Sequence, residues 1–408
     1  MMRRVSLCVV ALFAAASMSA QTPAKPRARE LGISALLGGT AGPLDAITDV
    51  AGVEVGHTTL ISGSGKLVVG QGPVRTGVTV IHPRGKRSPD PVFGAWFTLN
   101  GNGEMTGTTW LQESGLLEGP IAITNTHSVG VVRDAILQWQ VSRPGLQPWG
   151  LPVVAETYDG RLNDINGFHV TAKNTIDALD GAASGAVAVA EGNVGGGTGM
   201  VCHGFKGGIG TASRRLDVAL GSYTVGVLVQ CNYGQRRELR IAGVPVGEEI
   251  PDLLSCVAST DATVLPNAPR CGAAAPARED ENDGAGSIII VVATDAPLLP
   301  HQIKRLVTRA SLGVGRMGGK GENGSGDIFV AFSTANPGVA SDTGVARIAM
   351  LPNARMNALF TATVQATEEA IVNALLAAET MTGANDVRVF ALPQDRLMAS
   401  MRKYNRLR

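Results

Sequence analysis

A serine with no neighbouring histidine stands between a glycine and an apolar run in "EDENDGAGSIIIVVATDAPLLPHQ", residues 279–302. This serine, Ser287, can be activated by its own α-amino group, whose ordinary pKa of roughly 7.7–8.0 suits proton transfer near neutral pH. The amine becomes free only when the preceding bond is cut. The Ser287 hydroxyl can attack the Gly286 carbonyl, giving an ester by an N-to-O acyl shift that water then hydrolyses. The pattern predicts self-cleavage between Gly286 and Ser287 and an N-terminal serine nucleophile.

The residues on both sides of Ser287 fit this chemistry. Gly286 lacks a Cβ, and the attack needs a strained, crowded turn. Residues 288–292 are all β-branched, which predicts a rigid strand that fixes the hydroxyl. The alternative interpretation is an ordinary turn that ends where a buried strand begins.

Other motifs for catalysis or cofactor binding are absent or badly placed. Six histidines are scattered along the chain, and no H-E-x-x-H, G-x-S-x-G or phosphate-binding G-x-x-x-x-G-K-[ST] motif occurs. Residues 313–318 match G-x-G-x-x-G but follow a predicted helix, not a strand, so dinucleotide binding is not expected. The sequence therefore predicts neither a metal site nor a cofactor.

The composition indicates a compact globular protein. Of 408 residues, 44% are hydrophobic and 17% are charged, which argues against disorder. The formal net charge of +1 argues against a nucleic-acid surface, which would need clustered Lys and Arg.

The N-terminus has the pattern of an export signal. Arg3 and Arg4 precede an apolar run at residues 5–16, and small residues follow it before Gln21. The run falls in the signal-peptide range and is too short to span a bilayer. We expect residues 1–20 to be a signal peptide and the mature protein to be periplasmic or secreted and free of the membrane. A core helix is the alternative.

Export would make disulfides possible among the four cysteines beyond the signal. Cys256 and Cys271 flank a loop rich in Ala, Pro and Thr and are the natural pair. Cys202 and Cys231 stand in apolar, strand-like contexts and are expected to be buried thiols. No C-x-x-C spacing occurs, so structural zinc is not expected.

The hydrophobic patterns predict an α+β protein. Short strand-like runs broken by glycine fill the first half, interrupted by helical patterns at 131–141 and 171–179. After Ser287 the pattern alternates, and it predicts these elements: strand 288–293, helix 300–311, strand 328–333, helix 356–380 and strand 387–391. The last helix keeps Leu359, Val364, Ala370, Ile371 and Leu375 on an apolar face. We expect a four-layer αββα sandwich.

Several long motifs, in order, resemble one known family. They are "PVVAETYDGRLNDI", "VCHGFKGGIGTASR", "VGVLVQCNYGQRRELRI", "GSIIIVVATDAPLLPHQIKRL", "GENGSGDIFVAFSTAN" and "VQATEEAIVNAL". The chain resembles the β-peptidyl aminopeptidase / L-aminopeptidase D-amidase-D-esterase family from about Gly42 to Leu392. The resemblance implies a fold like that of the N-terminal-nucleophile hydrolases. It also implies a precursor that splits into an α subunit, 21–286, and a β subunit, 287–408, with an assembly of about four αβ units.

The resemblance also assigns site residues. Ser287 would be the nucleophile, and Ser325 and Asp327 the serine and acid beside it that relay or orient its proton. Many relatives carry Glu at the position of Asp327, so this carboxylate is one methylene shorter. Asn232 matches the amide that holds the oxyanion, and Tyr158 a tyrosine lining the same pocket. As alternatives, Asn232 could be a turn residue and Asp327 a strand cap.

Glu156 is a candidate for substrate recognition. It stands two residues before Tyr158 on a predicted strand, so both side chains should point to the same side. Its carboxylate could pair with the ammonium of a substrate, although a solvated edge charge is the alternative.

Together these features predict an exported, self-processing serine aminopeptidase. Its substrates would be short peptides, amino-acid amides or esters with a free amine. Two rival interpretations stay open: an acyltransferase like the ornithine acetyltransferases, which use a threonine nucleophile, and an inactive secreted binding protein of the same fold.

Overall fold

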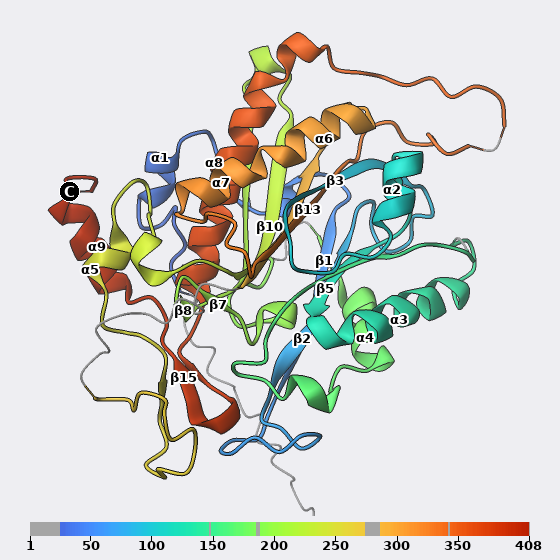
Figure 1. Cartoon of the computed structure of the whole chain (residues 1–408). Helices are drawn as coiled ribbons and strands as arrows, with labels where there is room; N and C mark the ends of the chain where they lie inside the picture. Colours follow the sequence, from blue (N-terminus) through green and yellow to red (C-terminus); the bar gives the residue numbers. More distant parts are fainter. Residues whose placement is uncertain (1–24, 147, 185–187, 274–285, 342, 408) are drawn as a thin grey trace, which may run out of the picture.

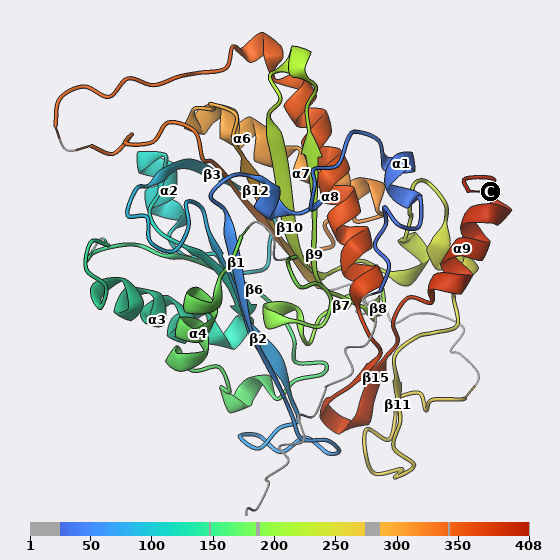
Figure 2. The same ribbon diagram turned by 180° about the vertical axis from the view of Figure 1, so that it is seen from behind.

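A computed structural model of the chain describes residues 25–146, 148–184, 188–273, 286–341 and 343–407. The predicted signal peptide, 1–20, lies outside the described residues, and so does most of the loop before Gly286. The described part forms two main β-sheets with helices on their outer faces (Figures 1 and 2). This arrangement confirms the predicted α+β sandwich.

The smaller sheet has the order β1-β2-β5-β6 and is antiparallel except for the β5–β6 pair. Its strands are β1 (Glu54–Ser62), β2 (Val74–His82), β5 (Ile121–Asn125) and β6 (Val153–Thr157). The larger sheet has the order β4-β3-β13-β12-β10-β9, and only β12 and β13 pair in parallel. Its strands are β3 (Val92–Gly101), β4 (Leu116–Leu117), β9 (Gly208–Arg215), β10 (Thr224–Asn232), β12 (Ser287–Thr294) and β13 (Gly326–Ser333).

Two minor sheets and the helices complete the fold. The minor strands are β7 (Val201–Cys202), β8 (Phe205–Lys206), β11 (Cys256–Val257), β14 (Met381–Thr382) and β15 (Val387–Val389). The helices are α1 (Ile33–Leu37), α2 (Thr108–Ser114), α3 (Val129–Val141), α4 (Ala172–Gly181), α5 (Val246–Glu249), α6 (Pro300–Thr308), α7 (Ala310–Arg316), α8 (Asn357–Ala377) and α9 (Gln394–Lys403).

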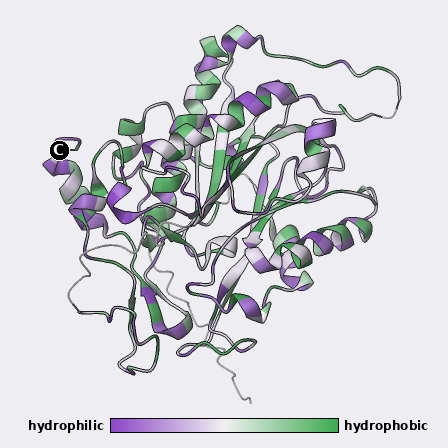
Figure 3. Cartoon of the chain, viewed as in Figure 1, coloured by the Kyte–Doolittle hydropathy of each residue, from purple (hydrophilic) through white to green (hydrophobic). Residues whose placement is uncertain are grey.

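Three apolar clusters separate the layers. One lies between the two sheets, a second lies under α6, α7 and α8 on the larger sheet, and a third lies under α3 and α4 on the smaller sheet. In Figure 3 the inner strands are mostly apolar, whereas α3 and α4 carry both polar and apolar residues. This mixture is typical of helices that cover a sheet and face solvent on their other side.

Strand β12 is buried on both faces, which explains its unbroken β-branched sequence. Ile289 and Val291 belong to the cluster between the sheets, and Ile288 and Ile290 belong to the cluster under the helices. Burying each such side chain stabilises the fold by roughly 1.5–3 kcal/mol. By the same alternation Ser287 faces the space between the sheets. The nucleophile predicted from the sequence thus begins the central strand of the larger sheet.

Some predicted elements differ in detail. The helix expected at 300–311 is divided into α6 and α7 at Arg309, and the strand expected at 387–391 is the short β15 of a minor sheet. Helix α8 buries polar side chains as well as an apolar face, whereas Val364 is only half-buried. One of these polar residues, Glu369, forms an ion pair with the buried Arg214, with 2.6 Å between Glu369 Oε2 and Arg214 Nη2. Arg214 lies on β9, far from α8 in the sequence, and its positive charge compensates the buried carboxylate. This explains why α8 can bury Glu369.

The cysteines form two disulfides. Cys256 is joined to Cys271, the pair expected from the sequence. Cys202 is joined to Cys231, so the expectation of two buried free thiols is wrong. Both of the latter are fully buried, and they meet because β7, which pairs with β8, lies against β10. The apolar sequence around Cys202 and Cys231 correctly predicts that both are buried. It does not indicate that each lies next to the other.

The loop closed by Cys256 and Cys271 gives a stability prediction. Replacing both cysteines by serine should lower the free energy of unfolding by roughly 3 kcal/mol, the loop-entropy value for a closed loop of about fifteen residues. Denaturant titration of the oxidised wild type and the double variant measures this difference. Non-reducing peptide mapping should find the pair linked, and free thiols at both positions in periplasmically expressed protein would contradict the prediction.

Candidate active site

Ser287 lies where strands of the larger sheet bring three sequence motifs together. It is paired with Asn232 on β10 and with Gly326 on β13. Its side chain is buried, and its Oγ accepts a hydrogen bond of 3.1 Å from the N–H of Gly326. A backbone donor fixed by strand pairing therefore holds the hydroxyl in place.

Gly286 occupies a place that only glycine can fill. A Cβ at this position would stand 1.7 Å from the carbonyl oxygen of Asn232, so any side chain would force the strands apart. The Gly286 carbonyl oxygen accepts from the same Gly326 N–H, at 3.3 Å. The carbonyl that self-cleavage would attack and the attacking hydroxyl thus share one donor.

Ser325 and Asp327 are in direct contact in spite of the shorter aspartate side chain. Ser325 Oγ donates to Asp327 Oδ1 at 2.6 Å, and the N–H of Ile288 donates to the same oxygen at 3.3 Å. Burial raises the pKa of Asp327 to about 6, although these two donors oppose the increase, and the nearby Glu322 carboxylate adds to it. The second oxygen, Oδ2, is buried without a hydrogen-bond partner among the described residues. Asp327 therefore gains or loses its proton near pH 6, within the pH range over which enzyme activity is measured.

A pH dependence follows from the raised pKa of Asp327. Protonation of the Ser287 α-amine, the base expected from the sequence, lowers kcat/KM as pH falls below roughly 7.7–8.0. Only the ionised Asp327 carboxylate can accept the Ser325 proton, so below pH 6 this decline should steepen by up to about a further tenfold per pH unit. In contrast, the folded state holds the proton more tightly than the unfolded chain, so the free energy of unfolding should decrease as pH rises from about 4 to 6. Asp327→Asn should lose this additional steepening below pH 6 and keep the decline caused by the α-amine, and Asp177→Asn on exposed α4 serves as control. The same steepening below pH 6 in Asp327→Asn as in the wild type would contradict the assignment.

Asn232 is oriented by two hydrogen bonds. Its Oδ1 accepts from the N–H of Val201 at 2.7 Å, and its Nδ2 donates to the carbonyl oxygen of Tyr158 at 3.0 Å. These partners fix which end of the amide carries the hydrogens and leave a second Nδ2 hydrogen for a ligand. The Tyr158 side chain is half-exposed and lies over Gly160, where a Cβ would be 2.2 Å from its hydroxyl oxygen. The backbone of Tyr158, not its hydroxyl, contacts Asn232.

Glu156 is buried, so it is not a solvated edge charge. Its Oε1 accepts from the N–H of Glu104 at 3.0 Å, and its Oε2 accepts from the hydroxyl of Thr126. Burial raises the pKa of Glu156, and these two donors oppose the increase. Strand β6 ends at Thr157, so the period-of-two alignment with Tyr158 is wrong: Glu156 is buried and Tyr158 is half-exposed.

Gly103 places the Glu156 carboxylate beside the nucleophile. A Cβ on Gly103 would stand 3.2 Å from Glu156 Oε1 and 3.2 Å from the Cα of Gly326. Gly326 in turn donates to Ser287. Two glycines, Gly103 and Gly326, therefore lie between the carboxylate and the hydroxyl.

The sequence reasoning missed Lys206. This lysine is fully buried, and its Nζ donates to the carbonyl oxygens of Met200 and Gly207, both at 2.8 Å, and of Gly197 at 3.4 Å. Burial lowers its pKa to about 7. It thereby ties together the glycine-rich turn whose Val201 N–H orients Asn232. A lone lysine among glycines in "HGFKGGIG" was the available signal.

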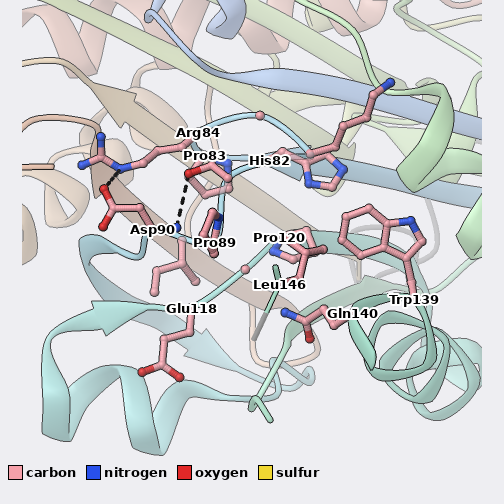
Figure 4. A pocket seen from close by; sticks show the side chains of 15 residues that line it. His82, Pro83, Arg84, Pro89, Asp90, Glu118, Pro120, Trp139, Gln140 and Leu146 are labelled. Carbon is pink, nitrogen blue, oxygen red and sulfur yellow. Dashed lines mark hydrogen bonds and ion pairs between the residues drawn. The ribbon is translucent and has the colours of Figure 1, made fainter. Parts of the chain in front are cut away.

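A cavity elsewhere in the molecule does not belong to this site. It lies among His82 at the end of β2, Pro120 before β5 and Trp139 of α3, with Arg84 paired to Asp90 (Figure 4). This is the opposite end of the smaller sheet from Glu156, which pairs with Thr124 near the end of β5. Its volume of about 30 Å³ has room for a water molecule but not for a peptide.

Two features are absent from the described residues. Within those residues, no group of three or more His, Cys, Asp or Glu side chains could hold a metal ion. Likewise, no helix in that part of the chain is long and apolar enough to cross a membrane.

Comparison with known structures gives the same fold over nearly the whole chain. The L-aminopeptidase D-Ala-esterase/amidase of Ochrobactrum anthropi, described as a new variant of the Ntn-hydrolase fold, is 44% identical with a TM-score of 0.81, and the match covers 94% of this chain and all of that one. A β-aminopeptidase of Burkholderia sp. is 48% identical with a TM-score of 0.78, covering 93% of this chain and 99% of that one. The predicted N-terminal-nucleophile-hydrolase-like fold is confirmed.

Sequence comparison agrees. The β-peptidyl aminopeptidase of Sphingosinicella microcystinivorans is 56% identical over 94% of this chain and 93% of its own, and that of Sphingosinicella xenopeptidilytica is 49% identical over 97% and 94%. The model of peptidase family S58 matches residues 45–389. The relatives support aminopeptidase activity and confirm the resemblance found in the sequence. The chain belongs to peptidase family S58.

Proposed function

We propose that this chain is an exported aminopeptidase that cuts itself between Gly286 and Ser287 and then uses Ser287 as an N-terminal nucleophile. The observation that carries the proposal is the shared Gly326 N–H, 3.1 Å from Ser287 Oγ and 3.3 Å from the Gly286 carbonyl oxygen. It supports attack of the hydroxyl on that carbonyl, because the donor is aimed at the oxygen where negative charge develops.

Self-cleavage then follows from these contacts. The Ser287 Oγ–carbonyl bond forms and the Gly286–Ser287 peptide bond breaks, so the chain is held by an ester and the α-amine of Ser287 is free. Water hydrolyses the ester and leaves a carboxylate on Gly286. The products are an α subunit ending at Gly286 and a β subunit, 287–408.

Turnover uses the freed amine as base. Glu156 binds the substrate ammonium, the Ser287 α-amine takes the hydroxyl proton, and Oγ attacks the substrate carbonyl. The free Nδ2 hydrogen of Asn232 stabilises the oxyanion, a contribution of about 2.7–4 kcal/mol in comparable sites. The proton passes to the leaving amine, and water releases the acyl group from Ser287. The contact of Ser325 with Asp327 supports their role in holding the proton path beside Ser287.

Export and assembly complete the proposal. The signal-like N-terminus and the two disulfides support an oxidising compartment, the periplasm or the outside of the cell. The substrates are short peptides, amino-acid amides or esters with a free amine. The working unit is an assembly of several αβ units, with four the expected number.

A substrate panel tests this function. Amides of α- and β-amino acids with a free amine should be hydrolysed, and their N-acetylated counterparts should react at least about a hundredfold more slowly, because a neutral amide cannot pair with Glu156. Equal rates for both series would contradict the assignment of Glu156. Transfer of an acetyl group to an added amino acid, without hydrolysis, would favour an acyltransferase instead.

A further inference from the structure

Phe168 combines two unfavourable properties. It has a φ of 52°, in the left-handed region that bulky side chains rarely adopt. Its apolar side chain is nevertheless 65% exposed. Each property costs free energy, and neither contributes to a core. Strained backbone conformations of this kind cluster at active sites and ligand clamps.

The loop around Phe168 is firmly held. Asp164 is buried, and its Oδ2 accepts from His169 Nε2 at 2.8 Å and from the N–H of Gly70 at 2.7 Å. These bonds lie on both sides of the turn Ile165–Gly167. The surrounding structure therefore imposes the strained backbone and presents the ring in one place.

The ring lies next to the residues around Glu156. Phe168 stacks on His127, with 5.8 Å between the ring centroids and 21° between the planes. His127 directly follows Thr126, whose hydroxyl donates to Glu156 Oε2. His127 is exposed as well. A two-ring aromatic surface thus begins at the residue next to Thr126, whose hydroxyl contacts the carboxylate that we assign to the substrate ammonium.

We propose that Phe168 and His127 form the wall that receives the side chain of the substrate's N-terminal residue, so that the enzyme favours residues with large apolar or aromatic side chains. This inference rests on the proposed function of Glu156. In an α- or β-amino acid the side chain leaves the backbone one or two carbons from the amine. A substrate held at Glu156 therefore places its side chain within reach of the stacked rings, which can cover it from water.

The test compares substrates that differ only in this side chain. The probes are the free-amine amides of phenylalanine and of glycine, each with its N-acetylated control. Phe168→Asn is the main variant, because asparagine tolerates a positive φ and so removes the ring without adding strain. His127→Ala removes the second ring, and Trp149→Ala, an exposed aromatic residue ahead of β6, is the matched control.

Phe168→Asn should lower kcat/KM for the phenylalanine amide at least about tenfold, mainly through KM, and leave that for the glycine amide within about twofold. His127→Ala should also lower the ratio of kcat/KM for the phenylalanine amide to kcat/KM for the glycine amide. Trp149→Ala should leave this ratio unchanged. The fragment that begins at Ser287 should still form in every variant.

Equal losses for both amides, or no loss for either, would overturn the inference. So would a change in the mass of the assembly in Phe168→Asn, because the ring would then be a contact between copies. If the wild-type protein hydrolyses neither amide, the proposed function itself fails. A working enzyme with an unchanged ratio rejects only the aromatic wall.

Discussion

Ser287→Ala should yield a single uncut chain with no amide hydrolysis. Both reactions need the same hydroxyl, which is the atom that contacts the Gly326 N–H. The wild type should separate under denaturing conditions into two fragments, the smaller of which begins Ser-Ile-Ile. Denaturing electrophoresis and N-terminal sequencing measure this difference.

Two further variants sharpen the result. Ser287→Cys keeps a nucleophile and should cut slowly, whereas Ser341→Ala, an exposed serine, should behave as the wild type. Fragment formation in Ser287→Ala would show that another residue or another protein makes the cut.

The second prediction separates substrate binding from chemistry. Glu156→Gln should leave self-cleavage intact, because the precursor has no free amine to bind at that position. Its turnover of free-amine amides should fall by about ten- to a hundredfold, the effect of roughly 1.5–3 kcal/mol for one charged hydrogen bond. Glutamine keeps the length of the side chain: its oxygen can still accept from the Glu104 N–H, and its NH2 can donate to the Thr126 hydroxyl, which then accepts. The loss therefore reports on the charge.

Asn232→Ala is the matched comparison. It should lower turnover by about 10²–10³-fold for all substrates, because the oxyanion loses a donor. Self-cleavage should be slowed less, since the Gly286 carbonyl oxygen already faces the Gly326 N–H. Should Glu156→Gln match the wild type on free-amine substrates, the carboxylate is structural and does not bind the ammonium.

Long periodic segments made the fold predictable from the sequence. The β-branched run of β12 and the length of α8 each specify one element, and their alternation after Ser287 indicates a layered sandwich. The division of the helix at Arg309 was not predictable, because neither proline nor glycine marks it. The Cys202–Cys231 disulfide was missed for a related reason: strand-like apolar context reveals burial but not which residue lies opposite.

The candidate site was predictable in its residues and not in its contacts. The serine, the acid and the amide stood in motifs that could be matched one by one. The Gly326 N–H, in contrast, reaches both Ser287 and Gly286 only because β12 and β13 pair in parallel with this register. The partners of Glu156 come from Glu104 and Thr126, which lie on other segments of the chain. Such contacts depend on tertiary placement, which residue spacing does not encode.

Trapping the acyl group on the β subunit tests the central claim most directly. An amino-acid ester is mixed with the mature enzyme, and the reaction is stopped with acid within one turnover. The mass of each intact fragment is measured by mass spectrometry, and the fragments are then sequenced. We predict an added mass of one acyl group on the fragment 287–408 alone, located on its first residue. The added mass should be absent in Asn232→Ala, because this variant forms the acyl-enzyme slowly. An acyl group on the other fragment or on a residue other than Ser287, or an enzyme that turns over esters as an uncut chain, would contradict an N-terminal serine nucleophile.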